Sequence, residues 1–427
     1  MGLMQKIKNW IKYSDSILAK FLYESIKLFF RSLTWIEFHL KVLLFYVFRI
    51  FPLQDKVVGS NFSGKRYGDN TKAIYEYLRS KDDGIQLVWV VRRPYQYPLP
   101  PEIKRIDRDN VFSVAYHYAT AKVWVDTHVI LPWIQKRKGQ MFIETWHGGL
   151  GIKKIFNNRN DAAKIPYELF EVDHMNRLAD LFVSNSDHIS RVYRNAIGYT
   201  GPIWRCGYPK NDRLFLDPAN ARKRVREQLS IPQDAKIAIY APTFRGLEMT
   251  GDPHDVAVRE VVRALGDRFG GEWYFFIRLH PITIRDGLGA FPSDEAIRDV
   301  TDYPDFQELV LACDAFLSDY SSGIFDAALL EKPCFVYAKD FEEYKAKNGV
   351  YYELDELPFP YAFTNESLIG NIEHYDHELF LEKWSAFMER VGLYETGHAT
   401  EEIGQLITAY IHGDPQKLED IKHECES

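Results

Sequence analysis

The sequence predicts an α/β protein with two parallel, doubly wound sheets behind an amphipathic N-terminal segment. Over most of the 427 residues, short apolar runs typical of strands buried on both faces alternate with helical patterns. A turn-rich cluster near residue 210 interrupts this alternation, which then starts again and so indicates two sheet domains. We therefore expect amphipathic helices at 1–52, sheet domains at 53–215 and 216–395, and a C-terminal helix and tail at 396–427.

Composition narrows the class of protein. Hydrophobic residues make up 46% of the chain, which is ample material for two cores. The four cysteines stand far apart without CxxC pairs, so we expect neither a disulfide framework nor a structural zinc site. This distribution of cysteines favours a location in the reducing cytoplasm. The net charge of −7 gives no indication of a nucleic-acid partner.

The N-terminal segment is basic, and its apolar residues are spaced so that they fall on one face of a helix. Residues 1–50 hold eight Lys and Arg against three Asp and Glu. The longest uncharged apolar run, 42–48, has seven residues, against the ~20 that span a bilayer, and no cleavable signal pattern is present. These apolar positions lie three, four or seven residues apart: Ile7, Ile11, Leu18, Leu22, Ile26, Phe29, Leu33, Ile36, Leu40, Leu44, Val47 and Phe51. We predict helices lying in a membrane surface, with a helical pair packed on the body or a dimerisation face as alternatives.

The first sheet domain begins after Pro52. Its strands are expected at 57–59, 87–91, 121–126, 142–146 and 181–184. A helix is expected at 71–80 with Asn70 or Thr71 as its cap, and the cluster 207–212 is interpreted as the hinge to the second domain.

The strand at 142–146 leads directly into His147, which is followed by Gly148, Gly149 and Gly151. A buried strand that ends this way delivers a side chain to the rim of the sheet and then turns sharply. Glycine accepts positive φ and lets a ligand approach the backbone, which suits a phosphate. The alternative is a core histidine beside an ordinary turn.

In the second domain, strands are expected to begin at 236, 273, 315 and 333, and three of them end in polar residues. The endings carry Arg245, His280 and the pair Ser321–Ser322 that opens a helix. Ligands bind at the carboxyl ends of strands in open α/β sheets, and a helix N-terminus offers N–H donors to an anion. Alone, the serine pair could be an ordinary N-cap, but together the three endings favour a phosphate site.

Two histidines at strand ends of two sheets indicate a site in the cleft between the domains. One can take a proton from an attacking hydroxyl, and the other can help to hold phosphate oxygens. The glycine-lysine phosphate loop, the GxSxG elbow and the HExxH pattern are absent from the sequence. Asp82–Asp83 is interpreted as a solvated pair rather than a metal-binding motif.

Five segments resemble the CDP-glycerol glycerophosphotransferase family of teichoic acid and capsule synthesis. They are 146–148, 207–212, 241–245, 278–281 and 318–322, in this order and spacing, and the similarity covers about residues 57–395. The resemblance implies a GT-B fold, two Rossmann-like domains facing a cleft, and a lipid-linked acceptor at the inner leaflet of the membrane. It implies transfer of glycerol phosphate, or in some members ribitol phosphate, from a CDP-alditol to a hydroxyl, with release of CMP.

The resemblance also assigns roles to individual residues. It implies that His147 is the general base and that His280 is a second essential histidine that steadies the diphosphate. The phosphate-binding serines are Ser321 and Ser322, with Asp319 orienting their loop and Asp326 one turn on. The remaining donor-binding positions that it implies are Trp146, Gly148, Gly149, Lys210, Pro242, Thr243, Arg245, Arg278 and Pro281. No metal ligand is assigned, although Mg²⁺ could accompany the diphosphate.

Two departures from the family pattern concern the substrate. The segment after His147 reads Gly149-Leu150-Gly151 and is one residue longer than usual, and Asn348 stands where arginine is common. A CDP-ribitol donor, a nucleotide-sugar glycosyltransferase of the same fold, and a non-catalytic membrane-associated binding protein therefore remain as alternatives. We expect a peripheral protein at the cytoplasmic face of the membrane, and the sequence indicates no oligomeric state.

Overall fold

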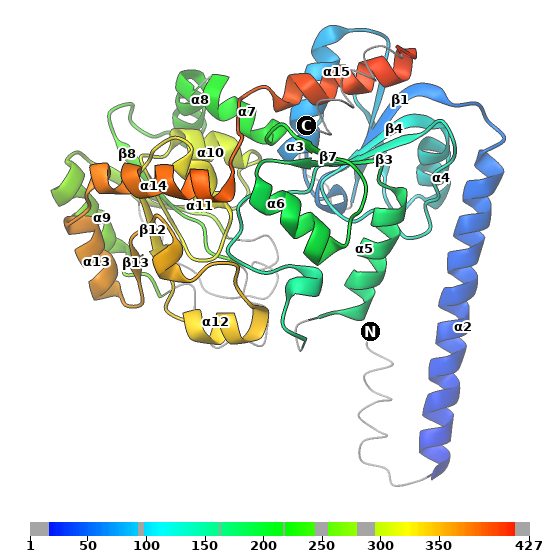
Figure 1. The fold of residues 1–427 in the computed structure, drawn as a ribbon, viewed down its shortest axis with the longest axis horizontal. Coiled ribbons are helices and arrows are strands. Elements are labelled where there is room, and N and C mark those ends of the chain that lie inside the picture. Colours follow the sequence, from blue (N-terminus) through cyan, green and yellow to red (C-terminus); the bar gives the residue numbers. More distant parts are fainter. Residues whose placement is uncertain are drawn as a thin grey trace.

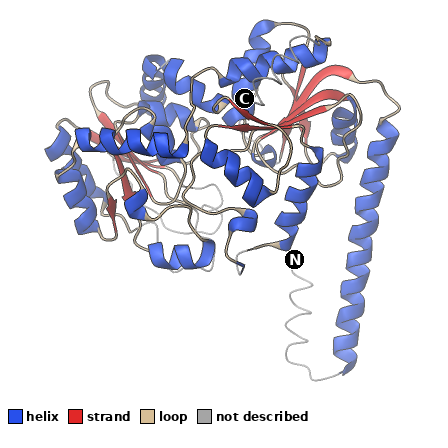
Figure 2. Ribbon diagram, in the orientation of Figure 1, coloured by secondary structure: helices blue, strands red, loops and turns tan. Residues whose placement is uncertain are grey.

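The structure is a computed structural model that describes residues 17–92, 98–161, 164–216, 218–243, 255–279 and 295–414. Figures 1 and 2 show two α/β domains side by side and one long helix that stands away from them.

The first domain contains a seven-stranded sheet in which every neighbouring pair is parallel. Its order is β3-β2-β1-β4-β5-β6-β7. The strands are β1 Gln54–Gly59, β2 Gln86–Val91, β3 Lys104–Asp107, β4 Ala121–Asp126, β5 Met141–Glu144, β6 Leu181–Ser184 and β7 Ile203–Arg205. The associated helices are α3 Asp69–Lys81, α4 Val111–Thr120, α5 Pro166–Leu178 and α6 Asp187–Val192, and short 3-10 or π turns occupy 62–64, 156–158 and 193–197.

The second domain contains a six-stranded sheet that is also parallel throughout, in the order β10-β9-β8-β11-β12-β13. Its strands are β8 Lys236–Tyr240, β9 Trp273–Ile277, β10 Ile297–Asp299, β11 Ala315–Ser318, β12 Cys334–Tyr337 and β13 Tyr361–Ala362. Its helices are α8 Pro218–Leu229, α9 Val258–Phe269, α10 Phe306–Ala312, α11 Gly323–Ala328, α12 Phe341–Asn348, α13 Asn365–Glu373 and α14 His377–Val391, with a 3-10 turn at 354–356. The prediction of two doubly wound sheets is confirmed.

Two helices join the domains. The predicted hinge is helix α7, Pro209–Leu216, which packs against α3 of the first domain and against α8 and α10 of the second. Helix α15, Ala399–His412, crosses back from the second domain and lies on α3 and α7, as Figure 1 shows. The end of the chain therefore braces the domain in which the chain begins.

The start of α3 corrects the predicted cap. The helix begins at Asp69, one residue before the first of the expected cap residues. Its N-cap is Gly68, and no side-chain hydrogen bond caps the helix there. The Asn70 and Thr71 side chains bond to other segments: Asn70 Nδ2 donates to the carbonyl of Trp146 at 2.9 Å, and Thr71 Oγ1 donates to that of Ser60 at 3.0 Å. These two side chains therefore connect α3 to the loops after the strands of the sheet, and they do not cap the helix.

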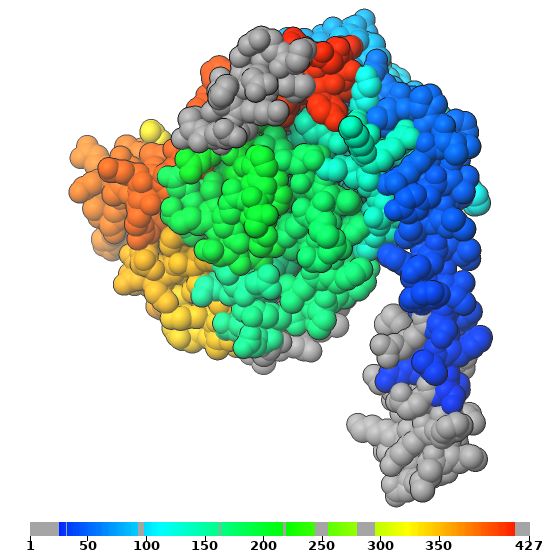
Figure 3. Space-filling model, turned by 45° about the vertical axis from the view of Figure 1, so that its right-hand side comes forward, coloured from blue at the N-terminus to red at the C-terminus, as the bar shows by residue number. Residues whose placement is uncertain are grey.

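The N-terminal segment forms one continuous helix in the described residues, α2 Ile17–Phe48. Its C-terminal part packs on α4, where Phe45 is fully buried, and Arg49 donates to the carbonyls of Gln135 and Lys136. The remainder projects from the body (Figures 1 and 3). None of the helices in the described part of the chain combines the length and the apolar character needed to cross a bilayer.

Candidate active site

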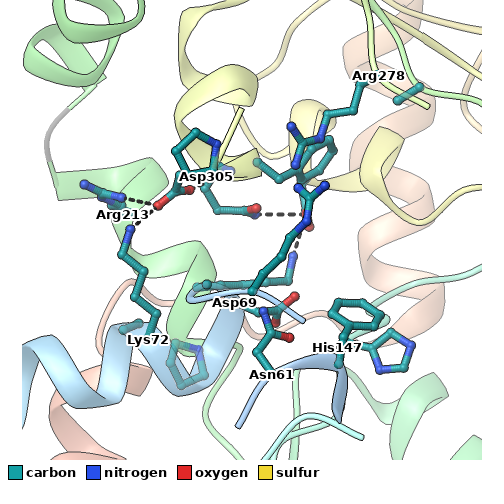
Figure 4. Close-up of a pocket in the computed structure, with 18 of the residues that line it drawn as sticks. Asn61, Asp69, Lys72, His147, Arg213, Arg278 and Asp305 are labelled. Atoms are coloured by element: carbon teal, nitrogen blue, oxygen red, sulfur yellow. Dashed lines mark hydrogen bonds and ion pairs between the residues drawn. The ribbon is translucent and has the colours of Figure 1, made fainter. Parts of the chain in front are cut away.

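A cavity of about 1000 Å³ lies between the two domains, at the carboxyl ends of β5, β8, β9 and β11. The residues of the first domain and of α7 that line it include Asn61, Phe62, Asp69, Lys72, His147, Lys210 and Arg213. The residues of the second domain that line it include Pro242, Thr243, Arg278, Asp305, Ser321 and Asp326. In Figure 4, Asn61, Asp69 and His147 lie across the cavity from Arg278 and Asp305.

The cavity therefore collects seven of the predicted site residues: His147, Lys210, Pro242, Thr243, Arg278, Ser321 and Asp326. Five others are not among the described residues that line it: Trp146, Gly148, Gly149, Asp319 and Ser322. The remaining three, Arg245, His280 and Pro281, fall outside the described residues. Their assigned roles stay predictions.

His147 is half-buried at the rim of the first sheet, directly after β5. Its Nδ1 lies 2.7 Å from the carbonyl oxygen of Thr127. A carbonyl can only accept, so Nδ1 carries the proton of the neutral ring and Nε2 keeps its lone pair. The ring of Phe62 packs against the imidazole with a centroid distance of 4.6 Å. Burial, opposed by the Thr127 hydrogen bond and reinforced by Lys210, lowers the pKa of His147 to about 4, so the ring is a neutral base.

Two buried carboxyl groups support the loops that hold this histidine. Asp126 and Glu144 are aligned residues at the ends of β4 and β5. Asp126 accepts from the backbone N–H groups of Thr127 and His128, and Glu144 accepts from the N–H of Trp146 at 2.8 Å. Burial raises the pKa of Asp126 to about 7 and that of Glu144 well above its ordinary value. The carboxyl groups fix the backbone on both sides of the Thr127–His147 hydrogen bond.

The turn after β5 differs from the expectation that its glycines supply positive φ. The positive angle falls on Trp146, at +52°, and Gly148, Gly149 and Gly151 are not among the residues with positive φ. Gly149 is required for space, because a Cβ there would lie 3.2 Å from Asn185 Nδ2 and 3.4 Å from the ring of Tyr208. The strand also ends at Glu144, two residues earlier than predicted. The sharp turn therefore rests on a strained tryptophan held by Glu144.

On the second domain, Asp319 organises the ends of β8 and β11. Its carboxylate accepts from the N–H of Thr243 at 2.8 Å and from Thr243 Oγ1 at 2.7 Å, and it also accepts from the N–H of Tyr320. Ser321 Oγ accepts from the N–H of Gly323 at 3.3 Å, whereas Ser322 caps the helix without a side-chain hydrogen bond. Asp319 thus joins the loop before α11 to the loop after β8, and its role toward a bound phosphate stays a prediction.

Lys210 and Asp326 form a buried ion pair between α7 and α11. Lys210 Nζ lies 2.5 Å from Asp326 Oδ2, and both side chains are less than one-tenth exposed. Gln307 Nε2 donates to the same carboxylate oxygen at 3.0 Å. Burial alone would lower the pKa of Lys210, but Asp326 and Asp69 outweigh it and the pKa is raised. Lys210 is therefore charged at the cavity wall and also clamps the two domains together.

A second set of interdomain contacts was not predicted from the sequence. Asp305 at the start of α10 pairs with Lys72 at 2.6 Å and with Arg213 at 2.7 Å. Arg66 Nη2 donates to the carbonyl of Thr301 at 3.0 Å. Single basic residues on a helix or loop give no sequence signal for a partner some 230 positions away. These contacts hold the loop after β1, α3 and α7 against the second domain.

The two segments that depart from the family pattern contact each other. Lys153 and Val350 form an isolated antiparallel bridge, in which the N–H of Lys154 donates to the carbonyl of Gly349 at 3.1 Å. The N–H of Tyr351 donates back to Ile152 at 2.7 Å. The segment after His147 and the segment after α12 therefore meet in one interdomain contact, and the effect of the two departures on the acceptor and donor sides stays a prediction.

The described ranges hold no group of three His, Cys, Asp or Glu side chains arranged for a metal ion. The carboxylates of Asp305 and Asp326 are instead paired with cations. Magnesium bound with the donor remains a prediction.

The model of the CDP-Glycerol:Poly(glycerophosphate) glycerophosphotransferase family matches residues 43–409. The chain belongs to this family. Among curated relatives, this glycerophosphotransferase family member is 28% identical to a teichoic acid glycerol-phosphate transferase of Staphylococcus aureus, over 83% of this chain and 93% of that protein. It is also 28% identical to a teichoic acid poly(glycerol phosphate) polymerase of Staphylococcus epidermidis, covering 82% of this chain but only half of that longer protein.

A structure of the wall teichoic acid polymerase TagF superposes with a TM-score of 0.76 at 25% identity, and the match covers 91% of this chain and 98% of that one. Together with the two parallel sheets, this match confirms the GT-B arrangement that the resemblance implied for this glycerophosphotransferase. The recognition of the family from five short segments is confirmed as well.

Proposed function

We propose that this protein transfers a polyol phosphate, with glycerol phosphate favoured, from CDP-glycerol to a hydroxyl group of a membrane-linked teichoic acid or capsule acceptor and releases CMP. The observation that carries the proposal is the imidazole of His147, whose Nδ1 meets the Thr127 carbonyl and which lies across a cavity of about 1000 Å³ from Thr243, Arg278 and Ser321 at strand ends of the second domain. The family description names the same donor and transferred group.

The reaction begins with the acceptor hydroxyl at Nε2 of His147. The hydroxyl oxygen attacks the β-phosphorus of the donor, the new O–P bond forms in line with the bond to CMP that breaks, and His147 takes the proton. The diphosphate lies against Arg278 and the loop before α11 of the second domain and against Lys210 of α7, and these groups stabilise the developing charge. Its negative charge also raises the basicity of His147 in the complex. No covalent enzyme intermediate is needed.

The direct test is CMP release by the purified protein with a short lipid-linked saccharide acceptor. CDP-glycerol, CDP-ribitol and a nucleotide sugar are offered in separate reactions. We expect CMP from CDP-glycerol at least tenfold faster than from CDP-ribitol. Faster release from CDP-ribitol would assign the ribitol reaction, which is named for relatives from Bacillus spizizenii. Turnover of the nucleotide sugar alone would overturn the phosphotransferase assignment and leave the glycosyltransferase alternative.

We place the protein on the inner membrane surface, with α2 as the element that contacts lipid. Large apolar side chains of this helix are exposed, among them Leu33 at 45% and Leu40 at 60%. They share one face because they are seven residues apart. Cys206, Cys313 and Cys334 are buried and form no disulfide among the described residues, which suits a reducing compartment.

Vesicle binding tests this location. Leu33→Gln combined with Leu40→Gln is expected to weaken co-sedimentation with vesicles of anionic phospholipid at least about tenfold, because each leucine contributes of the order of 1–2 kcal/mol when it enters the lipid interface. Leu379→Gln is the matched control, because this leucine is 46% exposed on α14 of the second domain. Equal binding by all three proteins would show that α2 serves another contact.

A further inference from the structure

Asp69 is the first residue of α3 and has a backbone conformation that is uncommon outside glycine. Its φ is +61°, and its side chain lines the cavity. Asn70, the next residue, is fixed on both sides: its Nδ2 donates to the carbonyl of Trp146 at 2.9 Å, and its Oδ1 accepts from the N–H of Lys210 at 3.0 Å. The strained turn therefore holds Asp69 between the loop of His147 and the charged end of α7.

The carboxylate of Asp69 accepts few hydrogen bonds from the protein. Within the described ranges, its one hydrogen bond comes from the N–H of Asn70, which donates to Oδ1 at 2.8 Å. Burial raises the pKa of Asp69 to about 6, and Lys210 is the first of the groups that lower it. The side chain is thus mostly ionised at neutral pH. A carboxylate with an oxygen directed into a cavity accepts hydrogen bonds from hydroxyl groups.

Asn61 supplies a donor on the same wall. The N–H of Phe62 donates to Thr127 Oγ1, so the Thr127 hydroxyl donates in turn to Asn61 Oδ1 at 2.9 Å. This chain fixes the amide with Nδ2 outward, and no described residue accepts from that nitrogen although Asn61 is only 3% exposed. Asn61 lies close to the turn of Asp69, because a Cβ on Gly68 would be 3.4 Å from Nδ2. Figure 4 shows Asn61 and Asp69 together on the wall that carries His147.

Charge decides what such a pair can bind. The diphosphate of the donor is anionic and belongs with Lys210 and Arg278, whereas an ionised Asp69 repels it. A hydroxyl group both donates and accepts, and so satisfies the carboxylate and the amide at once. We propose that Asp69 and Asn61 bind a non-reacting hydroxyl group of the alditol beside His147, and that Asp69 thereby determines specificity for a polyol. This inference rests on the proposed function of the same cavity.

The test combines variants with substrates that lack one hydroxyl. In the donor arm, CDP-glycerol is compared with a CDP-propanediol that lacks the central hydroxyl. In the acceptor arm, the acceptor used by the wild type is compared with its analogue lacking the hydroxyl next to the reacting one. Loss of the hydroxyl is expected to lower kcat/KM of the wild type by about 10- to 100-fold, because a hydrogen bond to a charged group is lost. In the Asp69→Asn variant, removal of the same hydroxyl group from the substrate is expected to lower kcat/KM by less than about 3-fold.

Three further proteins make the result decisive. Asn61→Ala is expected to show the same reduced sensitivity as Asp69→Asn. Asp82→Asn is the matched control, because Asp82 also has positive φ, at +48°, but lies exposed at the other end of α3. Asp69→Gly keeps the turn without strain, so it reports on the carboxylate even if Asp69→Asn folds poorly.

In each arm, one loss of kcat/KM comes from the Asp69 variant and the other from the missing hydroxyl group. The arm in which these two losses are not additive shows whether the donor or the acceptor alditol carries the bound hydroxyl. Additive losses in both arms would overturn the inference. Absence of CMP release by the wild type from CDP-glycerol would instead refute the proposed function, so the two failures are distinct.

Discussion

Replacement of His147 by alanine is expected to lower the rate of CMP release by about 100- to 10,000-fold, the usual contribution of a positioned general base. The reason is geometric: Thr127 holds the Nδ1 proton, so Nε2 is the atom that can receive the proton of the acceptor hydroxyl. Affinity for CDP-glycerol, measured by calorimetry, is expected to change less than about 3-fold, because the diphosphate lies against the opposite domain. Loss of rate without loss of binding would identify a base rather than a structural histidine.

The pH dependence supplies a second readout for this residue. A base works in its neutral form, so, beside the rise that ionisation of Asp69 causes near its pKa of about 6, kcat/KM of the wild type is expected to rise with pH through the pKa of His147, about 4 in the free protein. The residual rate of the alanine variant is expected to lack that rise. His374→Ala, a change at an exposed histidine of the second domain, is the control and should behave as the wild type. A rate within tenfold of the wild type for His147→Ala would contradict the mechanism.

Breaking the ion pair between Lys210 and Asp326 is expected to have the largest effect on stability. Either Lys210→Met or Asp326→Leu leaves the other charge buried without its partner, at a cost of about 3–5 kcal/mol in the free energy of unfolding. The pair joins α7 to α11, so the loss should also appear as looser association of the two domains. Thermal unfolding of each variant beside the wild type measures the first effect, and small-angle scattering measures the second.

The double variant separates stability from binding. Lys210→Met with Asp326→Leu removes both charges, and we expect it to recover most of the lost stability, because an apolar pair of similar volume commonly replaces a buried ion pair without loss. Affinity for CDP-glycerol should nevertheless stay about 10- to 100-fold below that of the wild type, since the cation that faces the diphosphate is absent. Single variants as stable as the wild type would show that the pair does not hold the domains together. Wild-type affinity in the double variant would remove Lys210 from the donor site.

The central strands of both sheets could be predicted, and the edge strands could not. The unpredicted strands are β3, β7, β10 and β13, which are the two edges of each sheet and have two to four residues each. A central parallel strand is covered on both faces and must be apolar throughout, which leaves a clear pattern. An edge strand is short and partly exposed, so its sequence is compatible with a loop. Pairing with a neighbour distant in sequence makes it a strand.

The candidate site shows the same division. His147, Thr243 and Ser321 each follow the end of a buried strand, and this placement already indicates that they share one cavity. Asp69, Asn61 and Asp305 carry no comparable pattern. Asp69 follows a glycine at a helix start, Asn61 is one polar residue in a loop, and Asp305 is an ordinary N-cap. Asn61 is held by Thr127, 66 positions away, and Asp305 by Lys72, 233 positions away, whereas Asp69 reaches the cavity through the position of its helix start.

The sequence by itself determined the two parallel sheets, the family and the strand ends that carry the chemistry, because periodicity and short motifs are local properties of the chain. Only the tertiary structure decided which contacts the residues at these strand ends make. It placed the positive φ on Trp146 rather than on the glycines, paired Lys210 with Asp326, and directed Asp69 and Asn61 into the cavity. The physical reason is that charge pairing, burial and backbone strain depend on neighbours brought together by folding, and the order of residues does not record which neighbours those will be.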